Sequence, residues 1–167
     1  MNRRLLLLAL AILPLSTAAL ADGLPAPTGD VVLEVTGKIA NTNKDGAAVF
    51  DMAMLAALPQ RTTITTSPWY DGKQTFAGPL GWALLNQIGA TGTTLKVTAL
   101  NDYVSEIPVG DFKDYKVILA TSLNGEPMSV RDKGPIFIIY PFDEEPSLNN
   151  ETYYGRSAWQ VKSIEVE

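Results

Sequence analysis

The chain of 167 residues contains no cysteine and no histidine. Soft metals and thiolate-tuned cofactors need sulfur or imidazole ligands, and neither is available from this chain. The same absence excludes Ser-His-Asp and Cys-His catalytic arrangements, because each requires a residue type that is missing. It also means that the protein folds without a disulfide framework.

Positive charge is scarce as well. The sequence has 13 basic and 18 acidic residues, a formal net charge of −5. A surface of this sign makes nucleic acid and anionic lipid poor partners. Paired carboxylates such as Glu144-Glu145 lie in an acidic stretch that is typical of a solvated loop, so they do not indicate glycosidase-type chemistry.

The one long apolar run lies at the start of the chain. Arg3 and Arg4 precede the run Leu5–Leu15, and Ala19-Leu20-Ala21 resembles a cleavage site before Asp22. This order predicts a signal peptide and a periplasmic or secreted protein, with a retained signal anchor as the alternative.

Removal of residues 1–21 would take away two basic residues and no acidic ones, which changes the formal charge from −5 to −7. Residues 22–167 are enough for one domain with a real core. No second apolar segment is long enough to cross a bilayer, so we expect no membrane span after cleavage.

The remaining sequence favours strands over helices. Alternating or β-branched segments predict strands at Val31–Ile39, Thr62–Thr66, Leu95–Leu100, Val104–Ile107, Val117–Thr121, Pro135–Tyr140 and Trp159–Val166. The last of these is expected in the interior of a sheet. Helical spacing and end signals predict short helices at Met52–Leu58 after Asp51, Pro79–Gly89, and Phe112–Tyr115 after Asp111. The class is therefore α+β with mostly β structure.

Two further segments have clear local signatures. Asn124-Gly125 is the strongest tight-turn signal in the chain. The acidic stretch Asp143–Glu151 is expected to form a surface loop.

Several short motifs occur in a fixed order between about residues 60 and 166. They are Gly78-Pro79-Leu80 before Leu84-Leu85 and Gly89; Asn101-Asp102-Tyr103 before Ile107-Pro108; Leu119-Ala120 before Asn124-Gly125-Glu126-Pro127-Met128; Gly134-Pro135 before Pro141; and Trp159-Gln160-Val161-Lys162-Ser163-Ile164. In this order the chain resembles the oxidoreductase molybdopterin-binding domain family of the sulfite oxidase superfamily. The resemblance implies a sulfite-oxidase-like fold with a mixed sheet and few short helices.

The resemblance also implies a place for the metal ligand. Family enzymes bind molybdenum through a cysteine that lies a few residues before a tryptophan. The corresponding segment here is Thr63–Ser67 before Trp69, with Thr65 as the expected position, and it contains no thiol. A threonine hydroxyl is a hard, poor replacement for a thiolate.

The family also holds the phosphate of its pterin cofactor with clustered arginine, lysine and histidine. Here histidine is absent, and the basic residues of the matching region are scattered among more numerous acids. The residues therefore disfavour a molybdopterin cofactor and indicate no metal-ligating or catalytic set.

Two groups of residues remain as candidates for binding. The first would line the former cofactor cleft: Thr65, Thr66, Trp69, Asn101, Asp102, Tyr103, Arg131 and Lys133. The second would form a partner surface of the aromatic-plus-arginine kind: Tyr153, Tyr154 and Arg156. The alternative for both groups is structural, since large aromatics pack cores, turn residues form turns, and neighbouring charges pair locally.

Three functional hypotheses follow. The leading one is an exported, non-catalytic domain that binds a small ligand or an envelope protein partner. The second is a molybdopterin-dependent oxidoreductase in which oxygen from Thr65, Thr66 or solvent replaces sulfur. The third is a periplasmic sensory or accessory domain that works with a membrane receptor.

Overall fold

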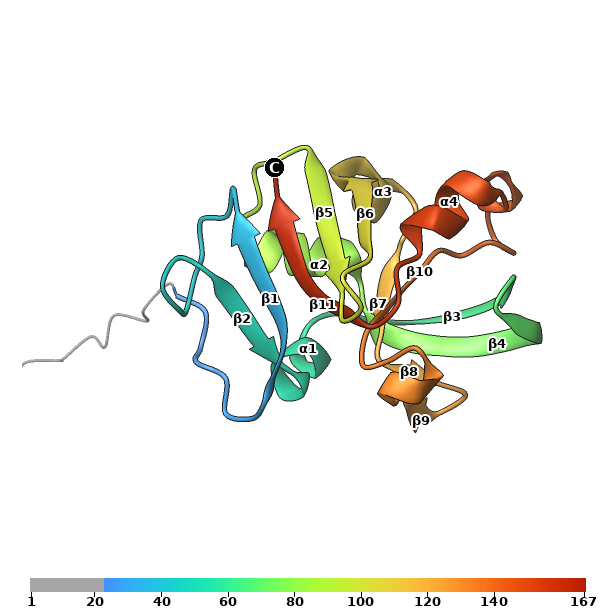
Figure 1. Ribbon diagram of the computed structural model, residues 1–167, viewed down its shortest axis with the longest axis horizontal. Helices are drawn as coiled ribbons and strands as arrows, with labels where there is room; N and C mark the ends of the chain where they lie inside the picture. The colour runs from blue at the N-terminus through green and yellow to red at the C-terminus, as the bar shows by residue number, and fades with distance from the viewer. Residues whose placement is uncertain (1–22) are drawn as a thin grey trace, which may run out of the picture.

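A five-stranded mixed sheet forms one half of the molecule (Figure 1). Its strands, in the order β2-β1-β11-β5-β6, are β1 (Val31–Gly37), β2 (Ala48–Asp51), β5 (Thr94–Ala99), β6 (Val104–Pro108) and β11 (Val161–Val166). Strand β1 pairs with β11 in parallel, and the other pairs are antiparallel. The prediction that the final strand lies inside a sheet is confirmed. The computed structural model describes residues 23–167, so the predicted signal peptide lies outside the described residues.

The second half is built on a long hairpin, which extends away from the five-stranded sheet in Figure 1. The hairpin strands β3 (Gln60–Ser67) and β4 (Tyr70–Pro79) belong to a four-stranded sheet with β8 (Ser122–Leu123) and β9 (Glu126–Pro127). Strands β7 (Ile118–Ala120) and β10 (Phe137–Ile139) form a separate antiparallel pair.

The helices are short. They are α1 (Met52–Ala57), α2 (Gly81–Gln87), α3 (Val109–Asp114) and α4 (Glu151–Arg156), with 3-10 turns η1 (Val130–Asp132) and η2 (Pro146–Leu148). None of the helices in residues 23–167 has the length and apolarity needed to span a bilayer. The predicted class, α+β with mostly β structure and few short helices, is confirmed.

Two hydrophobic clusters form the interior. The larger one joins the five-stranded sheet to α2 and α3, and the smaller one lies between β4, β7 and β10. Trp69, at the turn between β3 and β4, is partly buried and packs against both clusters. This aromatic ring therefore marks the boundary between the two halves of the structure.

Several local predictions are confirmed. Asp51 caps α1, since its Oδ1 accepts the Met54 N–H at 2.8 Å. Asn124 and Gly125 have φ angles of 51° and 89°, the left-handed values that a tight β8–β9 hairpin requires. The run around β10 is buried throughout, as expected for a strand covered on both faces.

Other predictions are wrong. Asp111 does not cap a helix, because α3 already begins at Val109 and Asp111 lies inside it. The stretch Asp143–Glu151 is not wholly a surface loop, because Leu148 is buried within η2 and Glu151 opens α4. Strands β2 and β4 and helix α4 were not predicted at all. In β4 the first residues are mostly polar and exposed, so the sequence shows no alternation of apolar and polar residues there.

Candidate functional site

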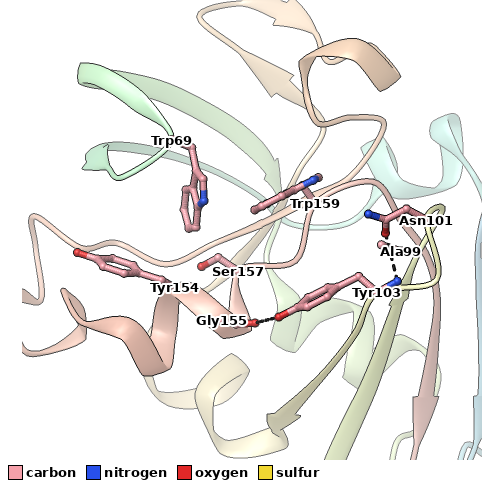
Figure 2. A pocket seen from close by; sticks show the side chains of 8 residues that line it. All are labelled: Trp69, Ala99, Asn101, Tyr103, Tyr154, Gly155, Ser157 and Trp159. Atoms are coloured by element: carbon pink, nitrogen blue, oxygen red, sulfur yellow. Dashed lines mark hydrogen bonds between the residues drawn. The ribbon is translucent and has the colours of Figure 1, made fainter.

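A cavity of about 280 Å³ lies between the hairpin tip, the β5–β6 turn and helix α4 (Figure 2). Eight residues line it: Trp69, Ala99, Asn101, Tyr103, Tyr154, Gly155, Ser157 and Trp159. Four of them are aromatic and none is charged. The lining is therefore apolar with a few polar groups, which is the usual composition of a small-molecule site.

Segments that are far apart in sequence meet here. Trp69 comes from the β3–β4 turn, and Asn101 and Tyr103 come from the turn between β5 and β6. Tyr154 lies on α4, and Trp159 lies on the segment that leads from α4 into β11. The cavity thus depends on the whole fold rather than on one loop.

Trp69 is held by edge-on contacts with other rings. Its centroid lies 5.2 Å from that of Phe137, 5.9 Å from that of Trp159 and 6.0 Å from that of Tyr154, with interplanar angles of 65°, 68° and 77°. These are favourable geometries for aromatic pairs. The wall is consequently formed by rings that are already ordered.

Hydrogen bonds connect the polar part of the wall. The Tyr103 hydroxyl donates to the Gly155 carbonyl at 3.1 Å, which also accepts the Ser105 hydroxyl at 2.9 Å. Asn101 Oδ1 accepts the Tyr103 N–H at 3.1 Å, and Ser157 Oγ donates to the Tyr153 carbonyl at 2.9 Å. The β5–β6 turn is thereby tied to the end of α4.

A partly buried ion pair joins α4 to α3. Arg156 Nη1 donates to Asp111 Oδ2 at 2.9 Å, and the Arg156 guanidinium lies 5.1 Å from the ring centroid of Tyr153. The Tyr140 hydroxyl donates to the same Asp111 oxygen. Burial, with the neighbouring Asp111 charge, raises the pKa of Tyr140 far above its usual value, so this group stays protonated as a donor.

Three of the eight predicted cleft residues come together in the cavity, namely Trp69, Asn101 and Tyr103. Asp102 points elsewhere and pairs with Lys162 at 2.6 Å, a hydrogen bond that lowers the pKa of Asp102. Arg131 is exposed on η1 and forms no ion pair with another residue in the range 23–167.

Lys133 lies beside the cavity wall. Its Nζ is 4.9 Å from the ring centroid of Tyr70 and 5.9 Å from that of Trp159. This is the geometry of a cation–π contact. Burial raises the pKa of the Tyr70 hydroxyl, and the charge of Asp132 adds to the effect. Lys133 thus contacts the rings that surround the cavity without lining it.

Thr65 and Thr66 lie outside the cavity and hold the segment after β10. Thr65 is fully buried, and its Oγ1 accepts the Asp143 N–H at 3.1 Å. Thr66 donates its hydroxyl to Asp143 Oδ1 at 2.5 Å, and Lys73 Nζ lies 3.0 Å from Asp143 Oδ2. These two interactions lower the pKa of Asp143. Both threonines therefore have a structural role in the observed arrangement.

The residues of the predicted partner surface lie on one helix. Tyr153 and Tyr154 are half-buried and pack against the larger core cluster, while Arg156 is engaged with Asp111. Tyr154 lines the cavity, which the sequence did not indicate. Trp159, Gly155 and Ser157 were also missed as site residues. An aromatic close to the start of the final strand was a signal for Trp159, and Gly155 and Ser157 had none.

The family that the sequence resembles implies a molybdopterin cofactor, and the cavity does not fit that group. No lining residue carries a positive charge to bind a phosphate, and the chain has no thiol to bind the metal. Residues 23–167 also contain no cluster of three acidic, histidine or cysteine side chains suited to a metal ion. Near the expected metal position, Ser67 Oγ is buried without a hydrogen-bond partner in this range, but one neutral hydroxyl is not a replacement donor set.

The fold and the cavity define a mostly β domain with a preformed, uncharged aromatic site. No family model and no curated protein matches the chain. Among solved structures, it is similar to the sulfane dehydrogenase SoxCD from Paracoccus pantotrophus, with a TM-score of 0.62 and 18% identity. The match covers 80% of this chain and 37% of the SoxCD chain.

This likeness confirms the sulfite-oxidase-like fold that the sequence predicted. The chain spans little more than a third of the length of the protein it matches. A shared fold at this identity does not carry an activity with it, because function belongs to the site and not to the scaffold.

Proposed function

We propose that this protein is an exported, non-catalytic binding protein that holds a small organic ligand in the cavity between Trp69 and Trp159. The observation that carries the proposal is the lining itself, in which four aromatic rings and no charged group surround about 280 Å³. Such a wall favours an organic molecule over a polyanionic cofactor.

The alternative of a molybdopterin oxidoreductase with oxygen ligands receives no support from Thr65 or Thr66. Their hydroxyls are engaged with Asp143 and with the backbone, and neither residue lines the cavity. A partner-binding or sensory role based on Arg156 is also disfavoured, because that guanidinium is committed to Asp111.

The test is to isolate the protein from the envelope fraction of its own host, without chelators, and to measure metals and bound molecules together. Elemental analysis is expected to find molybdenum and tungsten far below one atom per chain. Native mass spectrometry is expected to find an organic adduct that is lost on denaturation and lost in Trp159→Ala.

Trp82→Ala is the matched control, because Trp82 lies on α2 and does not line the cavity. Its adduct should remain. One molybdenum or tungsten atom per chain would overturn the proposal, and so would an adduct that survives unchanged in Trp159→Ala.

A further inference from the structure

Three hydrogen-bond donors of the cavity wall have no partner in the described part of the chain. The indole Nε1–H groups of Trp69 and Trp159 make no hydrogen bond with another residue in the described part of the chain, and no dashed line leaves either ring in Figure 2. Asn101 uses its Oδ1 to accept the Tyr103 N–H, which leaves its Nδ2 without a partner there. An indole N–H and an amide NH₂ group can only donate, so all three nitrogens require acceptors.

Figure 2 also shows where these donors point. The indole nitrogen of Trp159 is directed toward the Asn101 side chain, and the indole nitrogen of Trp69 is directed toward the middle of the cavity. The donors therefore come from three segments that line the same cavity.

Several polar groups of the wall are already in use. The Gly155 carbonyl accepts two hydroxyl groups, those of Tyr103 and Ser105. The hydroxyl protons of Tyr154 and Ser157 are directed to Asn149 Oδ1 and to the Tyr153 carbonyl. Among the side chains of the wall, the acceptors that remain for a ligand's own donors are the lone pairs of the Tyr103, Tyr154 and Ser157 hydroxyl oxygens. We therefore expect a ligand that fills this space to supply acceptors, because a donor that is buried without an acceptor is destabilising.

We propose that the cavity binds a flat, uncharged ring compound that bears carbonyl or ring-nitrogen acceptors. This inference rests on the proposed binding function and names the chemical class of its ligand. The ring faces pack against the edge-on aromatic wall, and the acceptors receive the Trp69, Trp159 and Asn101 donors.

Other ligand classes match the lining less well. A quaternary cation could contact the ring faces, but it has no acceptor and would leave the Trp69, Trp159 and Asn101 donors unpaired. A carboxylate or phosphate would need a cation, and none lines it either. A sugar would bring a hydroxyl donor with almost every acceptor, and the Gly155 carbonyl and Asn101 Oδ1 are already engaged as acceptors.

The experiment uses three two-ring compounds of similar size. Coumarin carries acceptors only, indole carries a donor only, and naphthalene carries neither; methyl glucoside represents sugars. The readout is the set of indole N–H signals of the ¹⁵N-labelled protein, which has three tryptophans. Trp82 is the internal control, since it lies outside the cavity. Trp69→Phe and Trp159→Phe assign the two cavity signals and preserve the ring surface.

Coumarin is expected to move the Trp69 and Trp159 signals downfield, leave the Trp82 signal in place, and bind at least about fivefold more tightly than naphthalene or indole. Asn101→Asp keeps the acceptor for Tyr103 and removes the free donor, so it should weaken coumarin binding and leave naphthalene unaffected. Asn86→Asp adds the same charge on the exposed face of α2 and should change neither.

Equal binding of naphthalene or indole, binding of the glucoside alone, or an unchanged coumarin affinity in Asn101→Asp would overturn the acceptor-ring proposal. An absence of shifts with every compound would overturn it as well. None of these results bears on the binding function, which stands or falls on the metal content and on the native adduct.

Discussion

The Tyr140 hydroxyl donates a 2.8 Å hydrogen bond to Oδ2 of Asp111, and both residues are buried. The same oxygen accepts Arg156 at 2.9 Å. Arg156 lies between Gly155 and Ser157, which line the cavity. The Asp111 carboxylate therefore connects the buried Tyr140, just after β10, to the segment that lines the candidate site. The interaction therefore links the stability of the fold to the shape of the cavity.

Asp111→Ala is expected to lower the free energy of unfolding by roughly 1–3 kcal/mol, because it leaves the buried Tyr140 hydroxyl and the Arg156 guanidinium without their acceptor. Urea unfolding measures the change. Asp114→Ala removes an exposed carboxylate from the same helix and should stay within about 0.5 kcal/mol of the wild type. Equal effects of the two variants would show that the Asp111 contacts contribute little.

The contrast between Asp51 and Asp111 shows why local signals predicted part of the fold and not all of it. Both are aspartates near the start of a short helix, and only Asp51 caps one. At Asp111 the chain is already helical from Val109, and the carboxylate is taken by Tyr140 and Arg156, which are distant in sequence. A long-range interaction of this kind leaves no local pattern.

The site was predictable to a similar degree. Trp69, Asn101 and Tyr103 stand out because aromatics and turn residues next to strand ends often reach a functional edge. Gly155 and Ser157 carry no such signal, since they become site residues only when α4 docks beside the β5–β6 turn. The spacing from Trp69 predicted Thr65 as a cleft residue. Side chains alternate between the two faces of β3, and that of Thr65 points into the interior.

Gly78 and Gly155 should respond in opposite ways to replacement by alanine. A Cβ at Gly78 would lie 2.0 Å from the Leu119 carbonyl oxygen, so the β4 backbone would have to shift. A Cβ at Gly155 would meet nothing within 4 Å, and alanine favours the helix. Gly78→Ala should lower the melting temperature by several degrees, and Gly155→Ala should leave it equal or raise it. A tolerated Gly78→Ala would contradict the close approach of β4 to β7.

Thr65→Val should expose the Asp143 amide to hydrogen exchange, because it removes the oxygen that accepts this N–H. Thr65→Ser keeps that oxygen and is the matched control. Exchange followed residue by residue by NMR should be faster at Asp143 in the valine variant and nearly unchanged there in the serine variant. If both variants leave the exchange rate unaltered, Thr65 does not hold the segment after β10.

Asp51 is expected to make the free energy of unfolding depend on pH. Its carboxylate accepts the backbone N–H groups of Met54, Thr28 and Gly29, each at 2.8 Å. These bonds, that of Met54 foremost, hold the pKa of Asp51 below its ordinary value of 3.8. Since the folded-state pKa is lower than the unfolded one, the stabilisation is present above about pH 4 and is lost as the pH falls through the folded pKa.

Asp51→Asn is therefore expected to be less stable than the wild type at neutral pH. Its amide has one acceptor oxygen, whereas both carboxylate oxygens of Asp51 accept backbone N–H groups. The difference should shrink as the pH falls below about 4, where the protonated Asp51 carboxyl resembles the amide. Urea unfolding at a series of pH values between 2.5 and 7 measures it. Asp30→Asn changes an exposed carboxyl nearby and should follow the wild-type curve. A stability gap that is constant across this pH range would mean that the cap contributes through its shape and not through its charge.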